Sequence, residues 1–134
     1  MESGEEHNKF IFNEKIDSEF LHNLYEDDYQ YMVEVFETTL RHFDEDVLPI
    51  QSAFGDSDFS GLRKALHKVK PVFGFTGLLR HQEVLGKFEE ACSGSQNISE
   101  LHSAYDSLME LIHEGRDIIE KEHKRLLAFT DFRS

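Results

Sequence analysis

Apolar residues separated alternately by three and four positions dominate this sequence and restrict it to helical folds. Between Asp28 and Pro49 one run of apolar residues with this spacing lies on one face of an α-helix, and its members are Tyr29, Met32, Val33, Phe36, Leu40, Phe43 and Val47. The 134 residues include only two prolines. No stretch alternates Val, Ile and Thr with polar residues, as a half-buried strand would. We therefore expect an all-α protein.

The same spacing predicts four further helices. A short helix is expected from Asp17 to about Tyr25, with Asp17 or Ser18 as its cap and Phe20, Leu21 and Leu24 facing inward. Pro49 is expected to kink or end the long helix. Later helices are expected from the turn at 55–58 to Gly77, from 78 to 91, and from Ser99 onward, where Gly115 is a candidate for a bend. Their inward residues are Leu62, Leu66, Val69 and Phe73; Leu78, His81, Leu85, Phe88 and Cys92; and Leu101, Tyr105, Leu108, Ile112, Ile119 and Leu126.

Four long amphipathic helices joined by short polar loops bury their apolar faces only against one another. We therefore predict an antiparallel up-down four-helix bundle with a short extra N-terminal helix. The domain spans residues 16–127, after an N-terminal leader at 1–15 and before a C-terminal tail at 128–134. Phe10 and Phe12 of the leader are expected to attach it to the core.

Charge and composition exclude several classes of function. The formal net charge is −13, and residues 1–60 carry 16 acidic against 3 basic side chains. A nucleic-acid binder needs clustered Lys and Arg, so we expect no nucleic-acid partner. No run of about 18 apolar residues predicts a membrane span. The polar, acidic start does not resemble a secretory signal, and the single cysteine, Cys92, fits a reducing cytoplasm.

One basic neighbourhood interrupts this acidic sequence. Residues 61–88 contain Glu83 as their only acid, against the cations Arg63, Lys64, Lys68, Lys70, Arg80 and Lys87. Helical spacing places Arg63, Lys64, His67, Lys70, Pro71 and Gly74 on one strip, about a quarter turn from the apolar stripe. We therefore expect an exposed His67 flanked by cations, with Pro71 and Gly74 leaving the surface beyond the ring open to a partner. Such a strip attracts an anionic group or an acidic surface.

This stretch resembles the histidine-containing phosphotransfer (HPt) domain of two-component phosphorelays. The family pattern is His-x-Leu-Lys-Gly-Ser-Ser-x-x-x-Gly followed by an apolar residue, and the chain keeps His67, Val69, Lys70, Gly77 and Leu78. It departs from the pattern at Pro71, Val72 and Phe73. Residues 16–40, "GLRKALHKVK" and "LLRHQEVLGKFEEAC" extend the resemblance to about 110 of the 134 residues.

The resemblance implies that His67 accepts and returns a phosphoryl group while Lys70 stabilises its charge. Arg63, Lys64, Lys68, Pro71 and Gly74 would dock the partner, which is a response-regulator receiver domain or a hybrid sensor histidine kinase. Magnesium would lie on the receiver, so this chain itself needs no cofactor, and we expect a monomer. The sequence has no GxxxxGK[ST] loop and no kinase signature, so we expect a transfer intermediate that does not use ATP itself.

Two other functions stay open at this stage. Pro71 removes the amide that would bond to the His67 carbonyl, so the chain is either a phosphotransfer protein or an adaptor that only binds receivers through the same face. Three Glu-x-x-His pairs, Glu19/His22, Glu110/His113 and Glu120/His123, also suggest a di-metal bundle enzyme. Because His113 lies on the polar face of its helix, we expect no metal site. Cys92 lies on an apolar line and is expected to be buried and inert.

Overall fold

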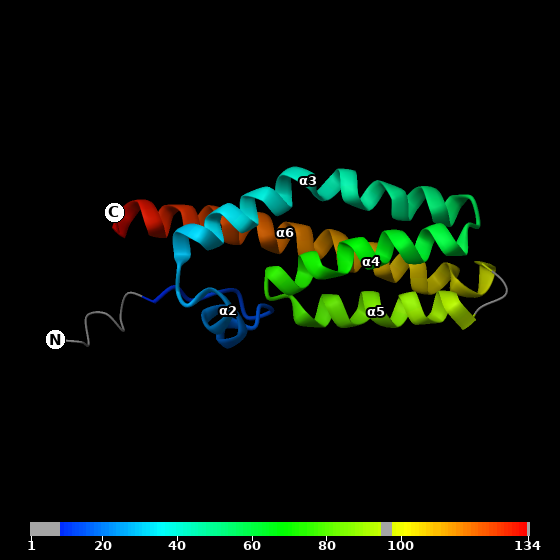
Figure 1. Cartoon of the computed structure of the whole chain (residues 1–134), viewed down its shortest axis with the longest axis horizontal. Coiled ribbons are helices and arrows are strands. Elements are labelled where there is room, and N and C mark those ends of the chain that lie inside the picture. The colour runs from blue at the N-terminus through cyan, green and yellow to red at the C-terminus, as the bar shows by residue number, and fades with distance from the viewer. Residues whose placement is uncertain (1–8, 95–97, 134) are drawn as a thin grey trace.

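The computed structural model describes residues 9–94 and 98–133, and every regular element in those residues is helical (Figure 1). The helices are α2 (Ser18–Tyr25), α3 (Tyr29–Gly55), α4 (Phe59–Phe75), α5 (Leu79–Gly94) and α6 (His102–Arg133), with a 3₁₀ turn, η1 (Ile98–Leu101), before α6. The predicted all-α class is confirmed. Within the described residues, none of these helices is both long enough and apolar enough to cross a membrane.

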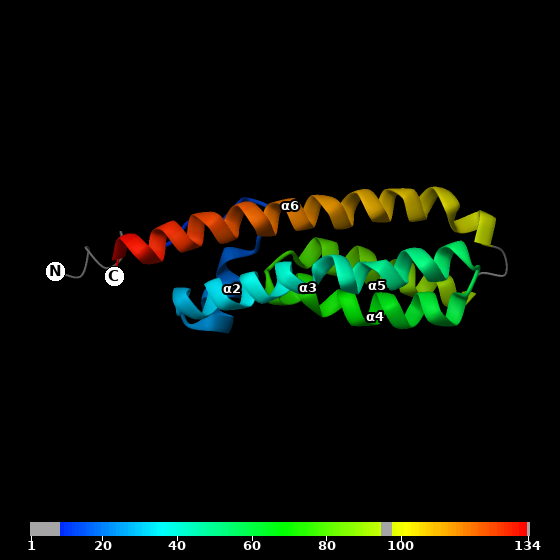
Figure 2. The same ribbon diagram turned by 90° about the horizontal axis from the view of Figure 1, so that it is seen from above.

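The four long helices pack side by side. Contacts join α3 to α4, α4 to α5, α5 to α6 and α6 back to α3, and successive helices run in opposite directions (Figure 1). Figure 2 shows α6 running along one side of the group formed by α3, α4 and α5. The short helix α2 lies at the end of this bundle where α4 ends and α5 begins, and the amide of Asp17 donates to the carbonyl of Gly77 at 2.9 Å.

Aspartates start three of the helices. The side chains of Asp17, Asp28 and Asp58 accept hydrogen bonds of 3.0, 3.0 and 2.9 Å from backbone amides in the first turns of α2, α3 and α4. Each carboxylate therefore satisfies an amide that has no partner within its helix. Asp17 is one of the two caps expected for α2, and Asp58 lies in the turn expected before α4.

Neither proline ends its helix. Of the two outcomes expected at Pro49, an end to the helix is excluded because α3 continues to Gly55, and α4 likewise continues past Pro71. Both prolines are exposed, so water can satisfy the carbonyls that they leave unpaired. Beyond Pro49, Ile50 and Ala53 are buried, and their packing offsets the lost hydrogen bond.

The core consists mainly of the predicted stripes, with two corrections in α2. Its buried residues are Leu21 and Tyr25, whereas Phe20 and Leu24 are 37% and 47% exposed. A helix of two turns at the end of a bundle covers only a narrow surface, so one side of it stays in solvent. Leu40 and Tyr105, expected to face inward, are only half-buried.

The leader is attached to the core, as expected from its two phenylalanines, and it contacts α6. Phe10 and Phe12 are buried, and the Phe10 ring lies 5.3 Å from the ring of Phe129. The buried carboxylate of Glu122 accepts from the amide of Asn13 at 2.8 Å and also pairs with Arg125. Residues 1–8 of the predicted leader lie outside the described residues.

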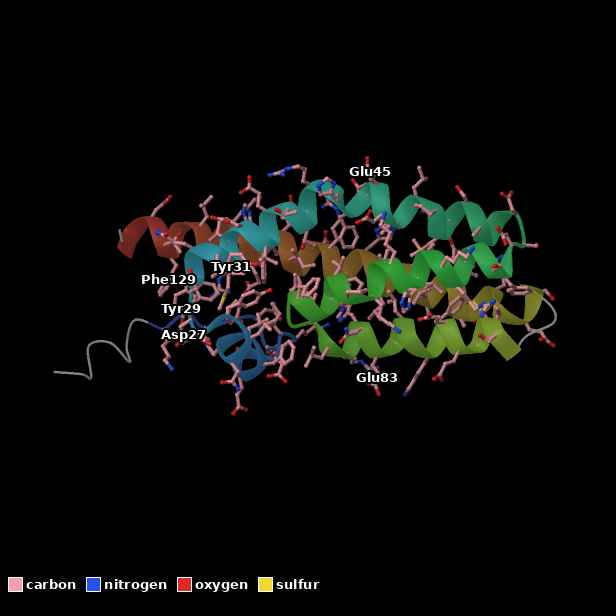
Figure 3. The ribbon with its side chains drawn as sticks, in the orientation of Figure 1. Asp27, Tyr29, Tyr31, Glu45, Glu83 and Phe129 are labelled. Atoms are coloured by element: carbon pink, nitrogen blue, oxygen red, sulfur yellow. The ribbon has the colours of Figure 1, made fainter. Side chains whose placement is uncertain are left out.

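Residues 128–133 are helical and do not form a separate tail, because α6 continues to Arg133. Phe129 packs between the leader and the start of α3, with its ring 5.3 Å from that of Tyr29 (Figure 3). The last turns of α6 therefore have a packing partner that the stripe ending at Leu126 did not reveal. The final residue, 134, lies outside the described residues.

Gly115 brings α6 close to two other helices without ending it. A Cβ at this position would lie 2.6 Å from Cε1 of Phe73 and 3.1 Å from Cδ2 of His81. The glycine therefore serves as a point of close approach between α6, α4 and α5.

Candidate functional site

His67 lies in the middle of α4 on its solvent-facing side. Its side chain is 74% exposed. The reason is the register of α4: Leu66 and Val69 are buried on the stripe, so the residue after Leu66 points away from the core. The predicted exposure of His67 is confirmed.

A single carboxylate on α5 contacts both His67 and Lys70. Nδ1 of His67 lies 3.3 Å from Oε2 of Glu89, and Nζ of Lys70 lies 3.0 Å from Oε1 of the same residue. The Glu89 side chain is only 23% exposed, so it is held against the α4–α5 interface. The histidine, the lysine and the glutamate therefore form one connected group.

Sequence reasoning missed Glu89, although the sequence contains a signal for it. Antiparallel helices joined by a short turn place residues equidistant from that turn opposite each other. Three observed pairs share the same midpoint, residue 78: His67 with Glu89, Lys70 with Gly86, and Gly74 with Gln82. Matching positions across the turn at Gly77 would have found this acid.

The geometry leaves one imidazole nitrogen free to react. Nδ1 of His67 is the ring nitrogen that faces the Glu89 carboxylate, so a tautomer that carries its proton on Nδ1 keeps the lone pair of Nε2. Because the ring is exposed, that lone pair is accessible to a group arriving from solvent. The arrangement can therefore orient a nucleophilic nitrogen, as carboxylate–histidine pairs do at other sites.

The other predicted residues fall on different parts of this face. Arg63 and Lys64 are exposed and line a hollow with His67 and Glu89. Lys68 is exposed but turns toward α3, where its Nζ lies 3.4 Å from Oδ1 of Asp46.

Pro71 is exposed one turn beyond His67, as expected, but Gly74 is buried. A Cβ at position 74 would lie 2.7 Å from Nε2 of Gln82. The prediction that Gly74 leaves the surface open is therefore wrong. The residue lets the Gln82 side chain of α5 pack closely on α4.

An exposed aromatic side chain continues the line of His67 and Pro71. Phe75, four residues after Pro71, is 53% exposed. Its carbonyl accepts a 2.6 Å hydrogen bond from the hydroxyl of Tyr25 in α2. Burial, together with neighbouring Tyr31, raises the pKa of Tyr25 to about 12, so this hydroxyl stays protonated and donating.

No metal centre is evident among the described residues. In residues 9–94 and 98–133, no three or more His, Cys, Asp and Glu side chains come together as a metal would require. Of the three Glu-x-x-His pairs, His22 pairs with Asp27, and Glu110 and His113 are both exposed. Cys92 is buried, and this burial raises the pKa of its thiol, in agreement with an inert residue.

A second histidine, His81, is buried near the turn between α4 and α5. Its Nε2 lies 3.1 Å from Oε1 of Glu114, and its Nδ1 has no hydrogen-bond partner among the described residues. Burial lowers the pKa of His81 more than the Glu114 carboxylate raises it. A hydrogen bond from Lys15 lowers the pKa of Glu114 itself.

These shifts predict that the protein loses stability in acid. Unfolded histidine takes up a proton near pH 6.5, whereas folded His81 takes it up only at lower pH. The contribution of His81 is therefore complete above about pH 6.5 and is lost as the pH falls from there through the lower pKa of the folded residue, and that of Glu114 is lost at still lower pH. Urea unfolding at pH 7, 6 and 5 should show a falling free energy of unfolding. His81→Phe should flatten the fall and the exposed control His102→Gln should not; equal slopes in all three proteins would contradict this assignment.

Comparison of the chain with protein-family models, with curated proteins and with solved structures finds no match.

Proposed function

We propose that this chain is a histidine phosphotransfer protein of a two-component phosphorelay. Nε2 of His67 attacks the phosphoryl group of a receiver-domain aspartyl phosphate. The N–P bond forms, the P–O bond to the aspartate breaks, and the aspartate leaves as a carboxylate. A kinase phosphohistidine is the other possible donor, and a second receiver aspartate takes the group in the reverse reaction. The observation that carries the proposal is the exposed His67 imidazole, whose Nδ1 lies 3.3 Å from the Glu89 carboxylate that also pairs with Lys70.

The arrangement of the helices supports the same proposal. The alternating directions of α3 to α6 and the ring of contacts between them support an antiparallel up-down four-helix bundle, the fold that the HPt resemblance implies (Figure 1). In this arrangement α4 presents His67 midway along its length, away from the loops. A receiver domain can then approach the histidine along a continuous helical face. We further propose that the protein acts as a cytoplasmic monomer.

The charge of this face suits the partner. A receiver domain holds magnesium and its phosphorylated aspartate in an acidic pocket, and the exposed cations Arg63 and Lys64 lie beside His67. Opposite charges of this kind increase the rate of association and fix its orientation. Phe75 adds an exposed aromatic anchor to this charged face, two turns from the histidine.

Lys70 supplies charge to the transferring group. Phosphoryl transfer depends on in-line positioning and on neutralising the equatorial oxygens. Lys70 lies one turn from His67 and is paired with Glu89 in the absence of phosphate. On arrival of the phosphoryl group, the ammonium moves from the carboxylate to a phosphoryl oxygen while Glu89 stays beside Nδ1.

Intact mass after incubation with a phosphorylated receiver domain and magnesium tests the proposal. The parent protein should gain one acid-labile phosphoryl group, and His67→Gln should gain none. The matched control is His102→Gln, which removes another exposed histidine and should behave as the parent does. A mass gain in His67→Gln, or none in the parent with several receivers, would contradict transfer through His67.

A second candidate function, a receiver-binding adaptor that carries no phosphate, is favoured by the carboxylate of Glu89. A negative charge 3.3 Å from the ring repels an incoming phosphoryl group, and Pro71 perturbs the same turn of helix. An adaptor would bind receivers without gaining mass. In that case Glu89→Gln and Pro71→Gly show which feature prevents transfer, because the responsible substitution should allow phosphoryl uptake.

A further inference from the structure

We infer that the groove between α5 and α6 is a docking surface for an acidic amphipathic helix of a partner protein. The groove has a volume of about 430 Å³ and does not include His67. It therefore goes beyond the proposed phosphotransfer function and does not depend on it.

Each helix offers the groove one regular face. The lining residues on α5 are Arg80, Val84, Lys87, Phe88 and Ala91, and those on α6 are Ala104, Ser107, Leu108 and Leu111. Each set contains one adjacent pair, Lys87 with Phe88 and Ser107 with Leu108, and its other spacings are three or four residues or sums of these, so each set forms a stripe along one side of its helix. Two such stripes on adjacent helices form a groove of the kind into which a third helix can pack.

The apolar parts of the groove are arranged for a helix. Phe88 and Leu108 are buried and form the floor, while Val84 and Leu111 are half-buried at its sides. Ala91, Ala104 and Ser107 are exposed and small, so the backbone of a docked helix can come close to the rim. From Arg80 to Ala91 the groove covers about three helical turns, or about 16 Å.

Charge selects the kind of helix. The chain has 27 acidic residues, yet none of the nine lining residues is acidic. The α5 rim instead carries two exposed cations, Arg80 and Lys87, seven residues apart. Two turns correspond to about 10.5 Å along the axis, the same separation as two acids spaced seven residues apart on a helix lying alongside α5. Glu83, the acid that pairs with Lys87 at 3.7 Å, points away from the bundle (Figure 3).

A synthetic peptide provides the probe. We would use a fluorescein-labelled helix of 18 residues with a leucine stripe at three- and four-residue spacing and two glutamates seven residues apart beside it. Its binding to the 134-residue chain is measured by fluorescence anisotropy. The control peptide has lysines in place of the two glutamates. We expect saturable binding of the glutamate peptide and at least tenfold weaker binding of the lysine peptide.

Variants locate the binding to the groove. Arg80→Glu combined with Lys87→Glu should weaken binding of the glutamate peptide about tenfold. Lys121→Glu combined with Lys124→Glu, an equal charge change on the exposed surface of α6, should leave it within twofold. The milder pair Arg80→Gln and Lys87→Gln provides the same test if the double reversal fails to fold, as judged by circular dichroism.

Several outcomes would overturn the inference. These are no saturable binding, equal binding of the two peptides, equal loss in the two charge-reversal variants, and binding of anionic lipid vesicles with no binding of the peptide. His67→Gln should bind the peptide as the parent does. Peptide binding and phosphoryl uptake are therefore measured independently. A failure of the docking proposal can be distinguished from a failure of the phosphotransfer proposal.

Discussion

Lys70→Ala is expected to slow phosphoryl uptake by His67 about 100-fold, the size of effect typical for losing one group that stabilises transition-state charge. Lys70 is the cation one turn from His67, and its Nζ lies 3.0 Å from the carboxylate that contacts the imidazole. Its removal leaves Glu89 without a counter-charge beside the phosphoryl group. Single-turnover transfer from a phosphorylated receiver, measured over a range of receiver concentrations, separates the transfer step from binding.

The controls for Lys70→Ala distinguish local from general charge effects. Lys70→Arg keeps the positive charge and should recover part of the lost rate. Lys124→Ala removes an exposed lysine on α6 and should leave the rate unchanged. The Lys70→Ala variant could bind receivers more weakly and still accept the phosphoryl group at the parental rate once the complex has formed. That result would assign Lys70 to docking and would contradict its role in stabilising the phosphoryl group.

Phe73→Ala is expected to lower the free energy of unfolding by about 3–5 kcal/mol. The Phe73 ring is fully buried where the four long helices meet, 6.1 Å from the ring of Phe43 and 5.5 Å from that of His81. On the side of α6 the ring faces Gly115, which has no side chain that could move into the cavity left by the ring. Urea unfolding followed by circular dichroism measures the loss, which is a large part of the stability of an ordinary domain.

Phe75→Ala provides a matched control two residues further along the same helix. It makes the same chemical change at a side chain that is about half exposed, and it should cost less than about 1 kcal/mol. The same variant should weaken receiver binding if Phe75 is an anchor of the docking face. Equal destabilisation by the two substitutions would contradict the burial pattern of α4.

The sequence allowed prediction of those features that depend on one helix at a time. The stripe of α4 and its cap at Asp58 are local patterns, and together they place His67 on the exposed side. The burial of His81 and Cys92 follows in the same way from the apolar line of α5.

Features that depend on how two elements meet were not predicted. Glu89 reaches His67 only because α5 returns antiparallel to α4, and Gly74 is buried only because Gln82 covers it. The exposure of Phe20 and Leu24 reflects the small surface that α2 covers, which apolar spacing does not report. The helical residues after 127 similarly depend on Phe129 meeting the leader, a contact between opposite ends of the chain.

The attachment of the leader to α6 also determines how the protein responds to mechanical load. Arg125 donates to the carbonyl of Ile11 at 2.9 Å and lies 4.7 Å from the Phe10 ring centroid, and Glu122 holds the amide of Asn13. A force that pulls residue 9 away from the bundle therefore acts first on these few bonds and rings. We expect the leader to separate from α6 before the four long helices separate from one another, so the weak point under tension lies where Phe10 and Phe12 of the leader join the core.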